Sequence, residues 1–318
     1  MKCAYIPIYL LFCSKLGIKV SKLNIDKCPL CGGEQFEKVM TCTDHYASGE
    51  SFEVHRCVHC HFLFTQNVPS ETEIGRYYQS PDYISHTDTT KGLMNKVYHW
   101  VRNYMLDKKA ALVKRVSLLP NTGKLLDIGT GTGYFSHAMQ QRGWEVSAIE
   151  KSPQARQFAK DHFGLLVDSE DKLSSYPAES FHVITLWHVM EHLEHLNETW
   201  ERLKVMLKKE GTLIVAVPNY TSYDAQHYGA WWAAYDVPRH LWHFSPDTMK
   251  QFADKHGFEC KEILPMPFDA FYVSMLTEKY RGKRFSFFRG CITGLKALLS
   301  ARANNERSSS LIYVFRKK

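Results

Sequence analysis

At 318 residues, of which 44% are hydrophobic and 23% charged, the chain has room for one large domain and a small one and the composition of an ordinary globular protein. No apolar run reaches the ~18–20 residues of a membrane-spanning helix, which argues against an integral membrane protein. The formal net charge of +7 is unevenly placed, because residues 279–318 hold eleven Lys or Arg and one acidic residue. The basic character therefore belongs to the C-terminal part of the chain.

Residues 1–26 form an N-terminal arm that is first apolar and then basic. Its apolar run, 4–13, has the length of a signal-peptide core, but lysines follow it in place of a small-x-small cleavage site. The nine cysteines do not resemble a secreted disulfide framework, since four form two C-x-x-C pairs and five are scattered. These features favour a cytoplasmic protein with reduced, metal-bound thiols, whose first residues are a short packed arm or an upstream extension.

Two C-x-x-C pairs dominate residues 27–65, and their four thiols belong to Cys28, Cys31, Cys57 and Cys60. Two such turns supply the four soft ligands that tetrahedral zinc prefers. Gly32 suits the positive φ needed after the second thiolate of a knuckle, whereas the other knuckle has His61 there. Because four protein ligands leave no open position on the metal, the sequence predicts a structural zinc-binding module.

Residues 66–119 are predicted to be a linker that begins as a loop and becomes helical from about Leu93. The loop contains Tyr77, Tyr78 and Tyr83, which are too many aromatic residues for a plain connection. We expect this segment either to form a lid over a ligand site or to pack against the zinc-binding module.

Residues 120–318 alternate strand and helix patterns, which predicts a doubly wound α/β domain with a mostly parallel, seven-stranded Rossmann-like sheet. The expected strands are 124–128, 145–150, 165–167, 181–186, 212–217, 258–264 and 311–315. An insertion at about 269–309 separates the last two strands.

The first of these strands ends in a glycine-rich turn, Asp127-Ile-Gly129-Thr-Gly131-Thr-Gly133. Glycine lets the backbone pass close to a bound nucleoside, and ligands of such sheets lie beyond the carboxyl ends of the strands. Glu150 ends the next strand, where its carboxylate can accept hydrogen bonds from ribose hydroxyls. The G-x-G-x-G spacing differs from the G-x-G-x-x-G of nicotinamide enzymes, so a different nucleoside cofactor is predicted.

The segments LLDIGTGTG, VSAIE and LWHVMEHL together resemble motifs of class I S-adenosylmethionine (SAM)-dependent methyltransferases. The third segment is similar to that of the ubiquinone-biosynthesis-type O-methyltransferases, and the resemblance covers roughly residues 120–265. It implies SAM as the methyl donor. The residues that it assigns to cofactor binding are Asp127, Gly129, Gly131, Gly133, Glu150, Asp171 and Leu186.

Two features depart from the family pattern. His182 stands where the family usually has an acidic residue, and the region after the third strand, VDSED, lacks the familiar G-D pair. The adenine contact is therefore assigned to a range, Asp168 to Asp171, and Leu186 to His188 are expected to flank the sulfonium.

Histidines cluster where an acceptor would meet the methyl group. His188 and His192 follow the fourth strand, and His240 lies in an aromatic loop after the fifth. Because histidine titrates near pH 7, it is suited to take the proton of an oxygen or nitrogen acceptor, and these three are the predicted catalytic residues. As an alternative, Glu191 and His192 hold a divalent ion beside the acceptor.

The sequence predicts a cytoplasmic enzyme that methylates an oxygen, or else a carbon or nitrogen, of a small or lipid-linked acceptor. Its acceptor pocket is expected to be lined by aromatic side chains, namely Trp231, Trp232, Tyr235 and Trp242. One rival is an RNA methyltransferase with a zinc module, although strand five ends in VPNY and lacks an N-P-P-Y/F motif. Another is a non-catalytic SAM-binding regulator, which the intact glycine-rich turn and Glu150 disfavour.

Basic and aromatic residues interleave through 279–299. This composition fits peripheral contact with an anionic membrane, at the inner face for a cytoplasmic protein. It also fits RNA, held by phosphate pairing and base stacking, which is the less favoured partner. A third interpretation is a solvated insertion whose aromatic residues cap the sheet.

Overall fold

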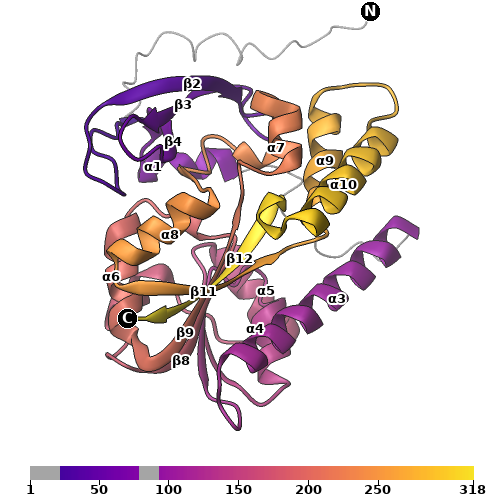
Figure 1. The fold of residues 1–318 in the computed structure, drawn as a ribbon. Helices are drawn as coiled ribbons and strands as arrows, with labels where there is room; N and C mark the ends of the chain where they lie inside the picture. Colours follow the sequence, from indigo (N-terminus) through magenta and orange to yellow (C-terminus); the bar gives the residue numbers. More distant parts are fainter. Residues whose placement is uncertain (1–21, 79–92) are drawn as a thin grey trace, which may run out of the picture.

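A six-stranded sheet lies at the centre of the computed structural model, which describes residues 22–78 and 93–318 (Figure 1). Most of the predicted N-terminal arm and the part of the predicted lid that contains Tyr83 lie outside the described residues. Around the sheet, Figure 1 shows flanking helices, a small β-sheet at one end and a pair of helices, α9 and α10, beside it.

The central sheet has the strand order β11-β12-β9-β8-β6-β7. Its strands are β6 (Lys124–Ile128), β7 (Glu145–Ile149), β8 (Phe181–Trp187), β9 (Leu207–Pro218), β11 (Phe258–Pro265) and β12 (Ser310–Lys317). Strands β7, β6, β8 and β9 pair in parallel, whereas β12 runs antiparallel to both β9 and β11. The predicted α/β Rossmann-like fold class is therefore confirmed, with a mixed sheet.

One of the seven predicted strands, 165–167, is not a strand. Only an isolated bridge between Ile149 and Asp168 forms at this edge, with Asp168 N–H donating to Ala148 O over 2.9 Å. The segment has one buried residue, Leu165, next to Leu166, which is 79% exposed. The polar residues that follow form a short 3₁₀ turn, η2 (Glu170–Ser175), because acidic side chains favour turns over a ladder. The sheet has six strands within the described part of the chain.

The larger helices follow the sequence pattern closely. They are α3 (Leu93–Val116), α4 (Tyr134–Gln140), α5 (Pro153–Phe163), α6 (Leu196–Met206), α7 (Tyr223–Tyr228), α8 (Pro246–Lys255), α9 (Asp269–Tyr280) and α10 (Ser286–Ala303). Helix α5 shows why: the Ser152 side chain caps it by accepting from Ala155 N–H, Pro153 opens it, and Gly164 ends it with φ +66°.

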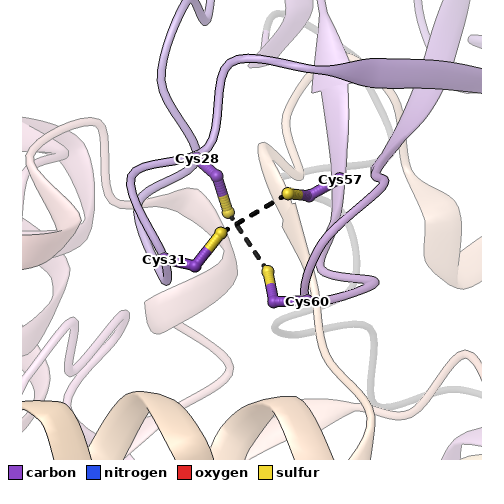
Figure 2. Close-up of side chains that lie close together, drawn as sticks. All are labelled: Cys28, Cys31, Cys57 and Cys60. Carbon is purple, nitrogen blue, oxygen red and sulfur yellow. Dashed lines mark hydrogen bonds between the residues drawn. The ribbon is translucent and has the colours of Figure 1, made fainter.

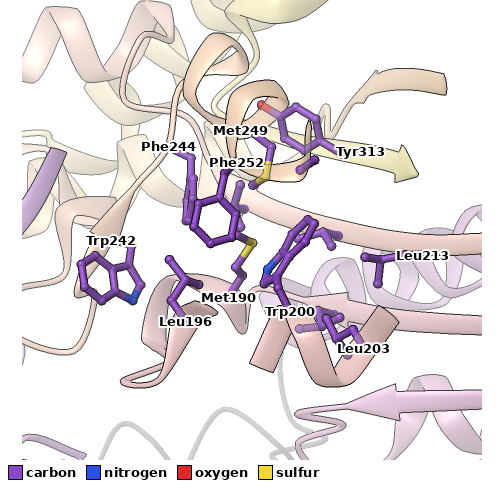
Figure 3. Packing of buried hydrophobic residues seen from close by; sticks show 14 of the residues in the cluster. Met190, Leu196, Trp200, Leu203, Leu213, Trp242, Phe244, Met249, Phe252 and Tyr313 are labelled. Atoms are coloured by element: carbon purple, nitrogen blue, oxygen red, sulfur yellow. The ribbon is translucent and has the colours of Figure 1, made fainter. Parts of the chain in front are cut away.

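Trp200 of α6 anchors the largest of three buried clusters. It packs edge-on against Phe252, Phe258 and Phe315 with ring centroids 5.3–5.6 Å apart. Figure 3 shows Trp200 and Phe252 among other residues of this cluster. This cluster contains residues of α6 and α8, whereas residues of α3 and α4 pack in the second cluster, with alternate residues of the same strands. The sheet is thus covered on both faces, as in doubly wound folds.

The small sheet, with order β10-β4-β3-β2, is built from two distant parts of the chain. Its strands are β2 (Phe36–Thr43), β3 (Ser51–Cys57), β4 (Leu63–Gln66) and β10 (Trp242–His243). Phe62 and Phe64 are fully buried in the same cluster as Trp200. The cysteine-bearing segment and the large domain therefore share one core.

The predicted insertion between the last two strands contains a hairpin formed by α9 and α10 (Figure 1). Two shorter pairs of elements precede α3: β1 (Lys22–Leu23) pairs with β5 (Val68–Pro69), and α1 (Glu71–Ile74) precedes the 3₁₀ turn η1 (Gly75–Tyr78). The remaining 3₁₀ turns are η3 (Met190–His192), η4 (Gly229–Trp231), η5 (Ala233–Tyr235) and η6 (Asn305–Arg307). Among the described helices, none combines the length and hydropathy needed to cross a membrane.

Candidate functional site

The glycine-rich turn connects β6 to α4 with φ +68°, +58° and +84° at Gly129, Gly131 and Gly133. These values favour glycine, which has no Cβ. A Cβ on Gly129 would lie 2.3 Å from Val189, and one on Gly133 would lie 2.9 Å from the Ala159 Cβ. A Cβ on Gly131, by contrast, would meet no described protein atom within 4 Å. Gly131 is therefore the glycine of this turn whose Cβ position faces open space, although its φ still disfavours other residues.

Two carboxylates hold this turn. Glu150 accepts hydrogen bonds from Gly131 N–H (2.8 Å) and Ser152 N–H (2.9 Å). Asp127 is 1% exposed and accepts from the hydroxyls of Ser136 and Thr185, both at 2.8 Å. Burial raises the pKa of Asp127 although these hydroxyl bonds lower it. Asp127 thus lies beneath the turn, while Glu150 lies at its edge and is half-buried.

The other predicted cofactor residues differ in exposure. Leu186 of β8 is fully buried in the largest cluster, so its side chain supports the sheet. Asp171 is exposed in η2 and accepts from the Ser169 hydroxyl, while Asp168 accepts from Tyr176 at 2.9 Å.

His188 follows β8 and lies between two carboxylates. Its Nδ1 is 3.3 Å from Glu191 Oε1 and its Nε2 is 3.0 Å from Asp269 Oδ2. Burial lowers the pKa of His188, but the hydrogen bonds and charges of Asp269 and Glu191 outweigh it and raise that pKa to about 10. Its backbone has φ +58°, which is uncommon for a non-glycine residue and typical of functional sites. The structure therefore holds His188 as an imidazolium.

His192 and His240 lie against each other with ring centroids 4.5 Å apart. Nδ1 of His192 is 3.0 Å from Arg239 O, and Nδ1 of His240 is 2.9 Å from Ala234 O. A carbonyl only accepts, so each Nδ1 donates a proton to its carbonyl, and in the neutral form of either ring the lone pair is on Nε2. Burial and the charge of His240 lower the pKa of His192 to about 4.

The carboxylate of Glu191 completes this group. Glu191 is 1% exposed, and its Oε2 has no hydrogen-bond partner among the described residues. One ligand atom each from Glu191, His192 and His240 lie within 4.8 Å of one another. A buried carboxylate oxygen without a partner is costly, so this arrangement suits a bound hydroxyl or a cation.

Three of the aromatic residues predicted to line an acceptor pocket are buried. Trp232, Tyr235 and Trp242 are at most 5% exposed. The indole N–H groups are used internally, Trp232 donating to Asp224 and Trp242 to Leu193 O. Trp231 is 44% exposed and stacks on His45.

Sequence reasoning missed Asp269, which contacts His188, and Lys109, which lies beside it in the site. Asp269 is 81 positions from its partner His188 along the chain, and Lys109 lies 4.3 Å above the Trp187 ring next to the site. Only the amphipathic face of α3 and the polar start of α9 could have drawn attention to Lys109 and Asp269.

Arg239 ties the small sheet to the histidines. It is 5% exposed and donates to Asp44 (2.9 Å), to Asp236 (3.0 Å) and to the carbonyl of Tyr77 (2.8 Å). Burial raises the pKa of Asp44, but the hydrogen bond and charge of Arg239 outweigh it and lower that pKa. The Arg239 carbonyl accepts a hydrogen bond from His192, so Arg239 connects Asp44 to the histidines.

The loop that contains Tyr77 and Tyr78 is predicted either to form a lid or to pack against the zinc-binding module, and the structure describes it as far as Tyr78. Tyr77 is fully buried against Phe52 of the small sheet, at 5.8 Å between ring centroids, and donates to Glu50. The Tyr78 hydroxyl is 3.3 Å from Nδ1 of His192. The start of the loop thus contacts both the small sheet and the histidines.

The four cysteines of the C-x-x-C pairs point toward one another (Figure 2). Their sulfur atoms lie within 4.8 Å of one another, with Cys28–Cys60 at 3.4 Å and Cys31–Cys57 at 3.5 Å. Gly32 and His61 have φ +75° and +61°, so both turns adopt the knuckle conformation, including the one without glycine. Four converging sulfurs on two rigid turns fit a tetrahedral metal ion.

A doubly wound sheet with an antiparallel β12 between β9 and β11, a G-x-G-x-G turn after β6 and an acid after β7 defines a SAM-dependent methyltransferase. A family model described as a methyltransferase domain matches residues 98–263, and the chain belongs to this family. The predicted enzyme class and its methyl donor, SAM, are thereby confirmed.

Relatives agree with this assignment. The chain is 27% identical over 174 residues to ubiquinone biosynthesis O-methyltransferase of Haemophilus ducreyi. This alignment covers 49% of this chain and 72% of that protein. The chain is 29% identical over 163 residues to the enzyme of the same name from Glaesserella parasuis, covering 46% and 69%. The fold is similar to that of Haemonchus contortus phosphoethanolamine N-methyltransferase 2, with a TM-score of 0.50, 14% identity and coverage of 89% and 68%.

We expect Asp44→Ala to lower the free energy of unfolding by about 3 kcal/mol, because it leaves Arg239 buried with one carboxylate fewer. Turnover should fall about 10-fold through misplacement of His192, while the Kd for SAM stays unchanged. Urea unfolding, single-turnover kinetics and calorimetry measure the three effects. Glu37→Ala removes an exposed acid of the same sheet and should change none of them beyond about 0.5 kcal/mol. Unchanged turnover in Asp44→Ala would contradict the link.

Proposed function

We propose that this methyltransferase transfers its methyl group to an oxygen of a small or lipid-linked acceptor. The observation that carries the proposal is the pair of imidazoles, His192 and His240, beside the buried carboxylate of Glu191. Because each ring donates through Nδ1, the Nε2 of its neutral form is suited to remove the proton of a hydroxyl group. Similarity to ubiquinone biosynthesis O-methyltransferases, at 27% and 29% identity, supports oxygen as the accepting atom.

The reaction is an in-line displacement, in which positioning lowers much of the barrier. SAM supplies a methyl group on a positively charged sulfur. The acceptor oxygen forms a bond to the methyl carbon as the carbon–sulfur bond breaks, and the electron pair of that bond returns to sulfur. We assign removal of the hydroxyl proton to Nε2 of His240 or His192.

His188 receives a different assignment. Its two carboxylate partners, Asp269 and Glu191, keep it protonated at neutral pH, which disfavours the general-base role expected from sequence. We assign it to positioning, since it joins the start of α9 to the carboxylate of Glu191.

For the donor, we assign Glu150 to the ribose hydroxyls and Gly131 to close backbone contact with the nucleoside. Asp127 and the other two glycines shape the turn from within the protein. Asp171 or its neighbour Asp168 is assigned to the adenine. Leu186 is fully buried, so we assign it to supporting the wall of the site from within the core.

Glu150→Ala should weaken SAM binding about 10- to 150-fold, because charge-assisted hydrogen bonds worth about 1.5–3 kcal/mol are lost. Isothermal calorimetry measures the change. The control is Glu145→Ala, at the other end of β7, where the side chain is 71% exposed and pairs with Lys124. An unaltered Kd in Glu150→Ala would refute the ribose assignment.

A second use of the same side chains is binding of a divalent ion. Glu191 Oε2, without a partner among the described residues, and the two Nε2 lone pairs form a carboxylate and imidazole donor set that suits zinc, iron or manganese. Such an ion would bind the acceptor oxygen and favour its deprotonated form. Activity that survives exhaustive chelation assigns proton removal to the histidines alone.

We also propose that the four converging thiols hold a structural zinc ion. The support is their spacing and the two knuckle turns, and no position is left for a substrate when all four bind.

Incubation of the protein with methyl-labelled SAM and separated lipid, small-molecule and RNA extracts tests the function. We expect label in the lipid or small-molecule fraction, in a product with an ether carbon. Label in RNA would overturn the acceptor class, and label bound to carbon or nitrogen would overturn the accepting atom. Absence of label in every fraction would favour a non-catalytic SAM-binding role.

A further inference from the structure

Helix α10 exposes its large apolar side chains. The exposed fractions are 65% for Phe288, 56% for Ile292, 50% for Leu295 and 52% for Leu299. Spacings of four, three and four residues place these side chains on one face of the helix. An ordinary surface helix turns such a stripe toward the core, so its exposure requires an explanation.

The opposite face of α10 carries small residues and packs closely on α9. The buried positions are Gly290, Thr293, Gly294, Ala297 and Ala301. A Cβ on Gly290 would lie 2.5 Å from the Cα of Met275, and one on Gly294 would lie 2.8 Å from the Cα of Phe271. Small residues inside and large apolar residues outside are the arrangement of helices that pack within lipid.

From the end of α9 through α10, the charged residues are all basic. Residues 279–303 contain seven Lys or Arg and no Asp or Glu. At the tip between α9 and α10, Lys283 and Arg284 are exposed, and Phe285 and Phe287 beside them are 62% and 46% exposed. The nearest acid, Glu278, is 1% exposed and paired with Arg281 and Arg289. An exposed apolar stripe thus lies on a positively charged hairpin.

We propose that the outer face of α10 and the tip of the hairpin dock on an anionic membrane surface. The helix lies in the plane of the interface with the stripe among the acyl chains, while the basic residues contact headgroup phosphates. Anionic lipid satisfies both halves of the pattern, whereas RNA offers phosphates but no apolar phase for the aliphatic stripe. A helix that lies on the membrane also agrees with the finding that no described helix is able to cross one.

The hairpin is joined to the candidate site. Asp269 begins α9 and contacts His188 at 3.0 Å, and Thr277 of the same helix accepts from Ala233 N–H at 2.9 Å. Docking would hold the histidines near the membrane, which suits a lipid-linked acceptor; this advantage rests on the proposed function. The docking surface itself depends only on the hairpin.

Flotation of the full-length protein with vesicles tests the proposal without SAM or acceptor. The vesicles contain either phosphatidylcholine alone or phosphatidylcholine with 30 mol% phosphatidylglycerol, a composition chosen so that anionic lipid, at about 1 kcal/mol per basic residue, dominates binding. We expect flotation with the anionic vesicles, weakened by high salt. Lys283→Glu/Arg284→Glu should lower the partition coefficient at least about 100-fold, and Phe288→Ser/Leu295→Ser at least about 10-fold.

Matched variants keep the test specific. Lys160→Glu/Lys209→Glu makes the same charge change on exposed lysines elsewhere, and Val205→Ser removes an exposed apolar side chain from α6. Both should float like the wild type. Circular dichroism and SAM affinity confirm that each variant is folded. The proposal is overturned if the wild type ignores anionic vesicles, if the hairpin variants float unchanged, or if a structured RNA competes the protein off the vesicles through the same residues.

Discussion

Alanine in place of His240 or of His192 should lower single-turnover methyl transfer by ~10²–10⁴ and leave SAM affinity intact, because each variant removes a lone pair suited to accept the acceptor's proton. Both rings are fixed through Nδ1 by carbonyl groups, so unchanged SAM affinity in each variant is needed to show that the loop keeps its fold. Rapid-quench measurements with labelled SAM determine the rate of the chemical step, and calorimetry determines the affinity.

His195→Ala is the matched control for these variants, since His195 lies on the same segment but is exposed. It should transfer methyl at the wild-type rate. If neither His240→Ala nor His192→Ala slows the single turnover, proton removal by these side chains is wrong and catalysis rests on positioning alone.

Cys28→Ser or Cys57→Ser should reduce bound zinc from about one ion per chain to almost none, because each removes one of four ligands. The unfolding free energy should fall by several kcal/mol and soluble yield should drop, since metal binding is coupled to folding. Cys28 and Cys57 are buried in the same cluster as Trp200, so the large domain should be destabilised as well.

Turnover should fall along with the metal. Strand β4 pairs with β10, and the Thr65 hydroxyl donates to the His240 carbonyl at 2.7 Å, so disorder in the small sheet reaches the histidines. Metal analysis and thermal unfolding measure the effect, with Cys260→Ser, a thiol outside the cluster, as control. Full zinc occupancy in both cysteine variants would refute the four-cysteine site.

Local pattern was enough to predict most of the elements. Strand and helix periods, the Ser152 cap with Pro153 and Gly164, and the glycine-rich turn depend on residues a few positions apart, whose preferences act before any distant contact forms. The C-x-x-C turns could also be predicted from local pattern, because each turn is made within six residues. The expected strand 165–167 failed, since its short apolar run is followed by acids that favour a turn.

The arrangement of the site was decided by tertiary structure. The sequence placed histidines near the ends of two strands, but it held no sign that Asp269 would keep His188 protonated or that Asp44 would hold Arg239. Nor did it show which face of α10 meets α9. These outcomes join residues that are far apart in the chain, where the partner, and with it the charge state or exposure of a side chain, is set by how whole elements pack. The sequence by itself determined the cofactor turn and the fold class, and packing determined what each histidine is suited to do.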